Sequence, residues 1–342
     1  MKKILTMLMA LALITSVFTA CDNSSKTQSQ TSSKAESQVE SGTDKYGPVT
    51  VENFNTSYVL EKMPTNITCL NLNTAEMIVA LGSVDSLANI ITGNYCIEDV
   101  SPEYLTELKK VTIAESISKG IPTLEAMIDL EPDMVVANSY YFNVPAFGTM
   151  EDYNSLGINF YIPEGSYVPN CTIEQTYKDI ENLGEIFNQK ENANALIDDM
   201  KNTIDAVSEK IKDQEAVKIA YIDSITEDGK YFVVGGAGLT NNLITLAGGE
   251  NVFANIEAQF SPVSLEDLIA SNPDVIIFSD YTSQKNNGQG KIDRVKNSGE
   301  LDSVNAVIND RFSFIPLYNT FPGLKNDEAV EAIAKALYPD LF

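Results

Sequence analysis

The sequence predicts an α/β protein with two lobes, each built on a mainly parallel sheet and joined by one long, rigid helix. Three observations lead to this fold class. Strand and helix patterns alternate in the first half of the chain, and the alternation restarts in the second half. A long helical pattern without proline or glycine separates the halves. A phrase that reads Leu-Glu, six residues, Pro-Asp and a hydrophobic run occurs once in each half.

The N-terminus has the features of a secretory signal. Lys2 and Lys3 precede an uncharged apolar run, which is shorter than the ~20 residues that a membrane span needs and ends in small residues. Because Cys21 follows directly, residues 1–20 are predicted to be a lipoprotein signal peptide, with Cys21 as the lipid-bearing first residue of the mature chain. An ordinary signal peptide with an incidental cysteine is the alternative.

The segment that follows Cys21 is polar. It carries seven serines between Asp22 and Lys45 and no aromatic residue. Such a segment buries too little apolar surface to offset the entropy lost on ordering, so residues 21–45 are expected to form a lipidated, disordered tether. The folded body is expected to comprise an N-terminal lobe (46–188), a connecting helix (189–213) and a C-terminal lobe (214–342).

In the N-terminal lobe, the strand candidates are short apolar runs rich in β-branched residues. They are Asn66–Leu72, Leu87–Thr92, Met134–Ala137 and Ile158–Ile162. Thr74 is expected to cap a helix that ends at Gly82. Ser101-Pro102 marks another helix start, because proline fits the first helical position. An apolar face repeated at helical spacing predicts a helix over Thr172–Asn188.

The connecting helix is predicted over Gln189–Lys212, where apolar residues recur at helical spacing. At ~1.5 Å per residue it would be about 35 Å long and could bridge two lobes rigidly. Beyond it, strands are predicted over Val217–Ile222, Tyr231–Val234, Val275–Phe278 and Phe312–Ile315, and helices over Leu239–Ala247 and Ala329–Leu337.

The repeated phrase predicts the same helix-to-strand unit in both lobes. Glu125 and Glu266 stand 141 positions apart. Thr123 and Ser264 can each cap a helix, which places each glutamate in the first helical turn. The Pro-Asp pair then ends the helix and begins a strand.

Composition excludes several classes of function. There are 23 basic and 48 acidic residues, a net charge of −25, which argues against nucleic acid or an anionic membrane surface as a partner. Histidine is absent, which excludes a Ser-His-Asp site and disfavours a bare Zn²⁺ or Mn²⁺ site. The glycine-rich stretch 235–238 lacks both nucleotide-binding signatures. We therefore expect no catalytic residues, no metal site, no cofactor and no enzyme activity. Pairing among Cys69, Cys96 and Cys171 cannot be assigned from their spacing.

Taken together, these motifs resemble the substrate-binding lipoproteins of ABC importers for iron–siderophores, haem and cobalamin. The resemblance covers the body from about Val49 to Phe342. It rests on Ala80-Leu81-Gly82, both copies of the repeated phrase, the stretch LAGGEN at 246–251 and Leu337-Tyr338-Pro339-Asp340. It implies two Rossmann-like lobes joined by one long helix, a ligand cleft between the lobes and modest lobe motion.

The resemblance also implies a role for the repeated phrase. Members of this family present one glutamate from each lobe to arginines of the two permease subunits, and Glu125 and Glu266 match those positions. The alternative is that each glutamate only favours its helix, a dipole effect of ~0.3–1 kcal/mol. The implied partners are a permease dimer with its ATPase, and the membrane only through the lipid anchor. The protein is expected to be a monomer outside the cytoplasm.

Ligand-binding residues are sought after the strands, because ligands of open α/β sheets bind off the carboxyl ends of strands. Aromatic, amide and hydroxyl residues gather in these loops, and core packing is the alternative for each aromatic. The predicted ligand-binding residues are Asn73, Thr74, Asn138, Tyr140, Tyr141, Phe142 and Tyr167 in the first lobe, and Gly236, Phe260, Tyr281, Tyr318 and Phe321 in the second.

An aromatic, amide-rich cleft suits a bulky ligand with apolar faces. Anionic siderophores would favour an arginine cluster, but the only arginines are Arg294 and Arg311. A neutral or cationic ferric siderophore is therefore the predicted ligand. A cobalamin-type corrinoid, or haem without a histidine ligand, remains an alternative. A surface receptor or sensor lipoprotein that is not coupled to transport is the alternative of another class.

Overall fold

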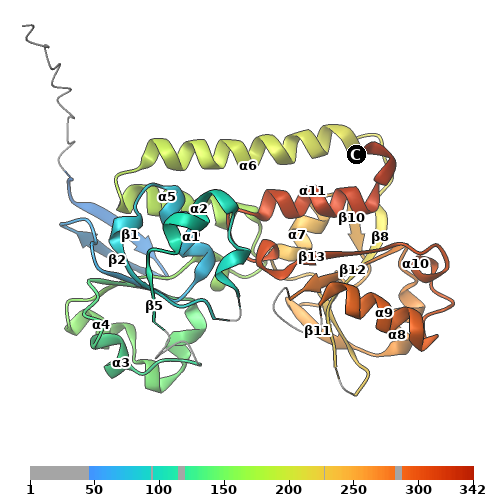
Figure 1. Ribbon diagram of the computed structural model, residues 1–342, viewed down its shortest axis with the longest axis horizontal. Helices are drawn as coiled ribbons and strands as arrows, with labels where there is room; N and C mark the ends of the chain where they lie inside the picture. Colours follow the sequence, from blue (N-terminus) through green and yellow to red (C-terminus); the bar gives the residue numbers. More distant parts are fainter. Residues whose placement is uncertain (1–45, 94, 115–119, 227, 282–286) are drawn as a thin grey trace, which may run out of the picture. The chain divides into compact units, whose positions relative to one another are not determined.

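The computed structural model describes residues 46–342, apart from residues 94, 115–119, 227 and 282–286. The predictions for the signal peptide, for lipidation at Cys21 and for the tether lie outside the described residues. Within the described part, no helix combines the length and the apolar character needed to cross a membrane. The fold is α/β, with one large sheet in each of two lobes and one long helix between them, as the sequence predicts (Figure 1).

The N-terminal lobe is built on a five-stranded sheet with the order β5-β4-β3-β6-β7. All four strand pairs are parallel. The strands are β3 (Ile67–Cys69), β4 (Leu87–Ile90), β5 (Thr112–Ile113), β6 (Met134–Val136) and β7 (Asn159–Tyr161). The helices are α1 (Leu72–Ala80), α2 (Pro102–Leu108), α3 (Leu124–Ile128), α4 (Met150–Ser155) and α5 (Ile173–Ile186).

The sheet of the C-terminal lobe has the order β11-β9-β8-β12-β13, and β10 also pairs with β8. Three strand pairs are parallel, whereas β9 runs antiparallel to both of its neighbours. The strands are β8 (Val217–Ile225), β9 (Tyr231–Val234), β10 (Gly249–Asn251), β11 (Phe260–Val263), β12 (Val275–Asp280) and β13 (Phe312–Pro316). The helices are α7 (Leu239–Leu246), α8 (Leu265–Ser271), α9 (Gly288–Ser298), α10 (Asn305–Ile308) and α11 (Asn326–Leu337).

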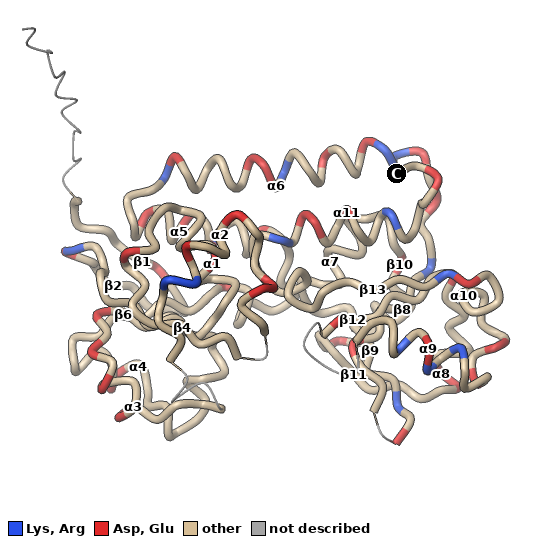
Figure 2. Tube along the Cα trace, viewed as in Figure 1, with Lys and Arg blue, Asp and Glu red and all other residues tan. Residues whose placement is uncertain are grey.

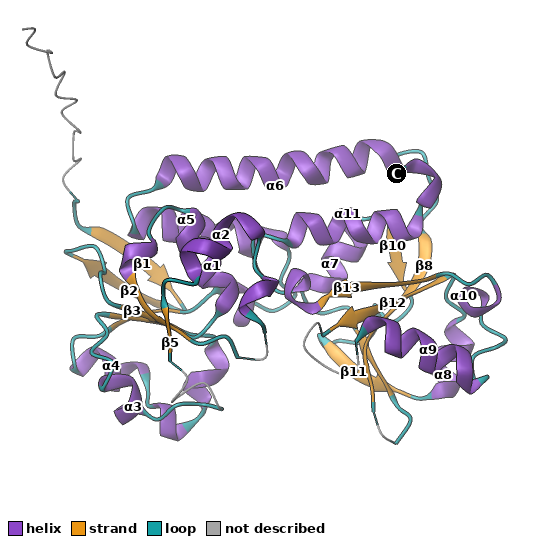
Figure 3. Ribbon diagram, viewed as in Figure 1, coloured by secondary structure: helices purple, strands orange, loops and turns teal. Residues whose placement is uncertain are grey.

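Helices cover both faces of each sheet (Figure 3). The strands therefore bury alternate side chains on opposite faces. Met134 and Val136 pack with α1 and α5, while Val135 packs with residues of α3 and α4. In the second lobe, Ile277 joins one core and Ile276 the other. Burial on both faces explains why these strands appear in the sequence as continuous apolar runs rather than as alternating patterns.

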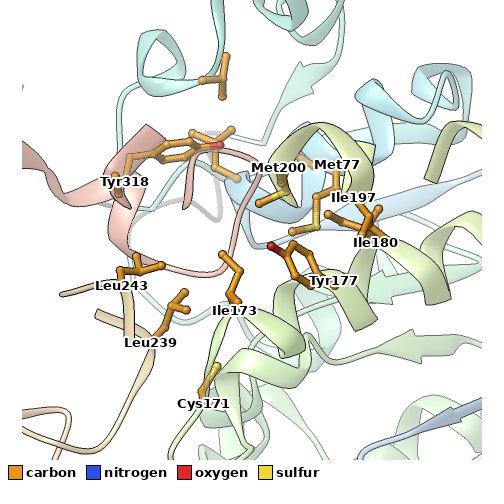
Figure 4. Packing of buried hydrophobic residues seen from close by; sticks show 14 of the residues in the cluster. Met77, Cys171, Ile173, Tyr177, Ile180, Ile197, Met200, Leu239, Leu243 and Tyr318 are labelled. Atoms are coloured by element: carbon orange, nitrogen blue, oxygen red, sulfur yellow. The ribbon is translucent and has the colours of Figure 1, made fainter. Parts of the chain in front are cut away.

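The connecting helix α6 spans Lys190–Ile211 and packs against α5 of the first lobe and α11 of the second. The largest hydrophobic core runs without interruption from one lobe to the other (Figure 4). Its members include Met77 of α1, Ile173 of α5, Met200 of α6 and Leu243 of α7. The two lobes thus share a core as well as a linking helix.

Two features of the N-terminal lobe differ from the sequence-based expectation. A separate hairpin, β1 (Val49–Asn53) and β2 (Thr56–Leu60), precedes the first predicted strand. In addition, α1 begins before Thr74, which was expected to cap it. The cap is Asn71, whose side-chain oxygen accepts a hydrogen bond from the Thr74 amide at 3.0 Å. Asn and Thr are both good caps, and the local pattern alone does not choose between them.

The repeated phrase folds as predicted in both lobes. The Thr123 hydroxyl caps α3 by accepting from the Ala126 amide at 3.2 Å, and the Ser264 hydroxyl caps α8 by accepting from the Asp267 amide at 3.1 Å. In each lobe the Pro-Asp pair then leads into a buried parallel strand, β6 or β12.

Candidate functional site

A cavity of about 550 Å³ lies between residues of the two lobes. Most of its lining follows directly after the carboxyl ends of strands, where open α/β sheets bind ligands. Its lining residues in the first lobe are Leu70, Asn71, Leu72, Asn73, Ile91, Thr92, Gly93, Tyr95, Gly120, Ile121, Asn138, Tyr140, Tyr141, Pro163, Gly165 and Ser166. Those in the second lobe are Gln259, Tyr281, Leu317, Phe321 and Pro322.

The first-lobe wall is held by hydrogen bonds between consecutive strand-end loops. The side-chain amide of Asn71 donates to the Asn138 side-chain oxygen at 2.7 Å. Ser139 donates two hydrogen bonds to Ser166, from its backbone amide to the Ser166 hydroxyl at 3.0 Å and from its own hydroxyl to the Ser166 carbonyl at 2.6 Å. These bonds join the loops after β6 and β7. These loops are therefore positioned before any ligand binds, which lowers the entropy cost of binding.

Two stacked tyrosines project from this wall. The rings of Tyr140 and Tyr141 lie 4.5 Å apart with an interplanar angle of 24°. Their environments differ, because Tyr140 is 50% exposed and Tyr141 only 5%. Tyr141 also packs against Phe147 in the core between α3 and α4. Of these two tyrosines, only Tyr140 has a large surface available to a ligand.

The second-lobe wall presents Tyr281 and Phe321. The Tyr281 hydroxyl donates to the Asp223 carboxylate, with both oxygens at 3.0 Å. The ring of Phe321 stacks on that of Phe260, with 6.4 Å between the centroids. Phe260 therefore supports the wall without lining the cavity.

A segment of the second lobe closes the floor of the cavity against the first lobe. Asn73 of α1 donates to the Tyr318 carbonyl at 3.1 Å, and the Tyr318 hydroxyl donates to the buried Glu76 carboxylate at 2.7 Å. Tyr95 lies against Tyr318 with 5.2 Å between ring centroids. Burial raises the pKa of Glu76, while the hydrogen bonds from Ser101 and Tyr318 act in the opposite direction. The floor is thus a polar and aromatic contact between the lobes.

The structure brings together six of the twelve predicted ligand-binding residues. Asn73, Asn138, Tyr140, Tyr141, Tyr281 and Phe321 line the cavity. Thr74, Phe142, Tyr167, Gly236, Phe260 and Tyr318 lie outside the lining. Tyr95 was missed, although it follows the predicted strand Leu87–Thr92 and could have been found by the same strand-end argument.

The residues outside the lining have visible structural roles. Tyr167 accepts a hydrogen bond from the Phe54 amide at 3.2 Å. Phe142 packs against Phe147, and Tyr318 is 2% exposed at the lobe contact. At Gly236 a Cβ atom would come within 1.9 Å of the Ala254 carbonyl oxygen, so glycine is needed there for backbone packing.

Among the described residues that line the cavity, none carries a charged side chain. Burial raises the pKa of Tyr95, Tyr141 and Tyr281 above the ordinary value, so their phenols are neutral at physiological pH. Within the described ranges, His, Cys, Asp and Glu form no group of three that could hold a metal ion. The cavity therefore offers aromatic surface, amides and neutral hydroxyls. Cys69, Cys96 and Cys171 are all free thiols.

Glu125 and Glu266 are exposed and lie outside the cavity lining. Each stands in the first turn of its helix, α3 or α8. These helices occupy different lobes, on the side of the molecule opposite α6 (Figures 1 and 2). Among the interactions of the described residues, neither carboxylate takes part in an ion pair or a hydrogen bond.

A family model described as periplasmic binding protein matches residues 67–318. Among curated proteins, the ABC transporter substrate-binding lipoprotein YvrC of Bacillus subtilis is 25% identical over 299 residues, which is 86% of this chain and 87% of that protein. A vitamin B12-binding protein of Vibrio campbellii is 27% identical over 187 residues, 55% of this chain and 62% of that protein.

Solved structures share the fold. A periplasmic binding protein from Veillonella parvula matches with a TM-score of 0.75 and 26% identity, over 85% of this chain and 98% of that one. A protein from Saccharomonospora viridis, titled as part of an ABC-type Fe³⁺-hydroxamate transport system, matches with a TM-score of 0.68 and 22% identity, over 84% of this chain and 98% of that one. At that identity the second match shows the fold alone.

Proposed function

Because this chain belongs to the periplasmic binding protein family, whose members bind solutes without transforming them, we propose that it captures a ferric siderophore for an ABC importer. The expected ligand is a neutral or cationic complex such as a ferric hydroxamate. The observation that carries this proposal is a cleft of about 550 Å³ whose described lining is rich in tyrosine and asparagine and includes no charged residue. Such a cleft suits a bulky ligand with apolar faces and a few polar groups.

Basic side chains are absent from that part of the lining that the structure describes, and this disfavours an anionic ligand. Anionic siderophores are best recognised by guanidinium groups, which form bidentate, charge-assisted hydrogen bonds. Arg294 and Arg311 both donate to backbone carbonyls of residues that do not belong to the cleft lining. Tyrosine rings and amides instead suit the apolar and carbonyl surfaces of a neutral complex.

A corrinoid is the second candidate, and it is favoured by the relatives named as vitamin B12-binding proteins. A relative named as part of a haem uptake system in Staphylococcus aureus is 26% identical over 162 residues. Haem would have to bind without a histidine ligand, since the sequence contains none.

We further propose that residues 1–20 are removed and that Cys21 carries the lipid anchor, as the name of the Bacillus subtilis relative suggests. The lobes are proposed to span 46–188 and 214–342, with 189–213 as the connector and 21–45 as a tether. The mature protein would act outside the cytoplasm as a monomer that docks on a permease dimer with its ATPase. Cys21→Ala should release the protein from membranes; a variant that still sediments with salt-washed membranes contradicts the anchor.

The ligand class can be tested on the purified full-length lipoprotein. The chain has 15 tyrosines and no tryptophan, so intrinsic fluorescence reports on tyrosine alone. Ferric tris-hydroxamates, ferric citrate, cyanocobalamin and haemin would be titrated in parallel, with native mass spectrometry to count bound ligand. Strong quenching by a neutral or cationic ferric hydroxamate and a weak response to ferric citrate are expected. Binding of cyanocobalamin or haemin alone would overturn the siderophore proposal.

An uptake assay distinguishes a carrier from a receptor that is not coupled to transport. Radiolabelled ligand should accumulate in wild-type cells and fail to accumulate in cells that lack this protein. Unchanged uptake in those cells, despite ligand binding by the purified protein, would favour the receptor.

A further inference from the structure

A fully buried lysine lies behind the second-lobe wall of the cleft. Lys291 of α9 is 0% exposed. Its ammonium donates to the Asp223 carbonyl at 2.7 Å and to the Ser279 carbonyl at 2.6 Å, close to the carboxyl ends of β8 and β12. An ammonium has three donors. The ammonium also lies over the ring of Tyr281, whose centroid is 4.6 Å from Nζ.

Tyr281 is therefore held at both ends. Its ring lies against the Lys291 ammonium, a contact that gains strength when both groups are desolvated. Its hydroxyl donates to the Asp223 carboxylate, whose side chain is 9% exposed. Tyr281 lines the cleft, whereas Asp223 and Lys291 do not.

The charges behind this wall do not cancel. Of the residues that the structure describes here, Lys291 contributes one positive charge, and its carboxylate neighbours Asp223 and Asp280 contribute two negative ones, so these three groups sum to −1. Asp280 accepts from the Gly288 amide at 2.7 Å at the start of α9. In a partly buried site, one uncompensated negative charge is screened less than it would be at the surface.

We propose that Asp223 and Lys291 are positioning residues for Tyr281, and that Asp223 makes this wall select against anionic ligands. The inference rests on the proposed function and refines its ligand class. The hydroxyl proton of Tyr281 is already committed to Asp223, so the ligand meets only a phenol oxygen lone pair and an aromatic ring. A ligand ammonium or amide N–H finds an acceptor there. A ligand carboxylate receives no hydrogen bond from the Tyr281 hydroxyl and approaches the charge of Asp223.

The positioning role is tested without a ligand, by NMR of the full-length protein labelled with ¹³C at Cζ of tyrosine. Tyr281→Phe assigns the signal. Asp223→Asn keeps the shape but replaces one acceptor oxygen with a donor, so the Tyr281 signal should move while the Tyr140 signal stays in place. Lys291→Met should move the same signal. Lys296→Met is the control, because Lys296 lies on the same helix but pairs with exposed Asp310 at the surface. An unmoved Tyr281 signal in Asp223→Asn overturns the positioning role.

The selectivity is tested with three ferric complexes of one linear tris-hydroxamate. The first keeps a free terminal amine, the second has that amine acetylated and the third has it succinylated, so only the charge of the terminus changes. The wild type should bind the amine and acetyl forms at least about tenfold more tightly than the succinyl form. Asp223→Asn should lower this preference several-fold. In the Tyr281→Phe background, Asp223→Asn should have a smaller additional effect, because the hydroxyl through which it acts is gone.

An unchanged preference in Asp223→Asn overturns the selectivity. If none of the three complexes binds the wild type, the proposed ligand class fails and the selectivity fails with it, while the NMR comparison still decides whether Asp223 and Lys291 position Tyr281.

Discussion

At the scale of single residues, a buried carboxylate stands directly behind the cleft. Asp179 of α5 is 1% exposed. It accepts hydrogen bonds from the Tyr161 hydroxyl at 2.5 Å and from the Glu164 amide at 2.9 Å through the same oxygen. The loop that it holds continues into Gly165 and Ser166 of the cleft lining. Burial raises the pKa of Asp179 to about 7, against the hydrogen bonds, which lower it.

Because its pKa is raised, the contribution of Asp179 to the free energy of unfolding depends on pH. The folded state holds the proton more tightly than the unfolded state, whose carboxyl has an ordinary value of 3.8. The contribution of Asp179 is therefore full below about pH 4 and is lost as the pH rises towards 7. In the wild type, this carboxyl should lower the free energy of unfolding by on the order of 4 kcal/mol between pH 4 and pH 8. Asp179→Asn should remove that pH dependence. Urea unfolding at several pH values measures it; equal slopes for variant and wild type would contradict the assignment.

The stacked tyrosines, Tyr140 and Tyr141, are expected to have different roles. Tyr141→Ala should destabilise the ligand-free protein by about 3 kcal/mol or more, because it empties part of the core beside Phe147. Tyr140→Ala should change the melting temperature little and weaken ligand binding by about tenfold. Thermal unfolding and fluorescence titration on the two single variants separate the roles. Equal stability losses would place Tyr140 in the core as well.

At the scale of elements, the N-terminal hairpin protects an edge of the first sheet. β7 is the last strand of that sheet, and the outer side of an edge strand leaves backbone groups unpaired. The side-chain amide of Asn53 donates through its nitrogen to the Ile162 carbonyl at 2.8 Å, and its oxygen accepts from the Ile162 backbone amide at 2.7 Å. The Tyr58 hydroxyl donates to the Phe160 carbonyl. Side chains of β1 and β2 thus replace a missing strand, immediately before Pro163 of the cleft wall.

Asn53→Ala should therefore destabilise the protein by about 1–3 kcal/mol, since it leaves both Ile162 groups without partners. Ligand affinity should fall modestly, because the following loop lines the cleft. Glu52→Ala is the matched control, because Glu52 lies on the same strand but is exposed. Urea denaturation of both variants tests this; similar unfolding midpoints would rule out edge protection by Asn53.

At the scale of the whole folded body, the lobes are joined by more than α6. Besides the shared core, the Thr176 hydroxyl of α5 donates to Asn326 of α11 at 2.9 Å, and the Ile173 amide donates to Asn242 of α7 at 2.9 Å. A continuous core and several hydrogen bonds between the lobes resist hinge motion. We therefore expect modest lobe movement on ligand binding, so that α3 and α8 keep a nearly fixed separation.

A fixed separation matters if Glu125 and Glu266 dock together on a permease dimer. Changing each to lysine should lower uptake and leave ligand affinity unchanged, because both side chains are exposed and outside the cleft lining. The double variant should be worse than either single one. Stability should fall by only ~0.3–1 kcal/mol per site, the helix-dipole contribution.

Glu191→Lys is the control for docking. Glu191 is also an exposed first-turn glutamate, but it lies on α6, away from α3 and α8 (Figure 1). The Glu191→Lys variant should lose a similarly small amount of stability and take up ligand as well as the wild type does. Normal uptake by the double variant at Glu125 and Glu266 would leave the repeated phrase with a purely structural role.

The sequence by itself determined the elements whose signals are local. The apolar spacing of α5 and α6, the caps at Thr123 and Ser264 and the buried strands after each Pro-Asp pair all follow from residues within a few positions of one another. The alternation of these elements was enough to predict two α/β lobes. Six of the twelve residues predicted from their place after strands line the cavity, because a parallel sheet gathers those loops at one edge.

Tertiary structure decided which loop side chains face the cavity. Tyr140 and Tyr141 are adjacent residues of the same type. Tyr141 is buried in the core because it packs against Phe147, whereas Tyr140 is half exposed. Gly236 was predicted to bind the ligand. It is instead a glycine because the backbone of Ala254 approaches too closely to leave room for a side chain. Lys291 and Asp223 are 68 positions apart, and no local pattern pairs them. Secondary structure is set largely by short-range periodicity and caps, whereas the direction of a loop side chain depends on contacts with residues far away along the chain.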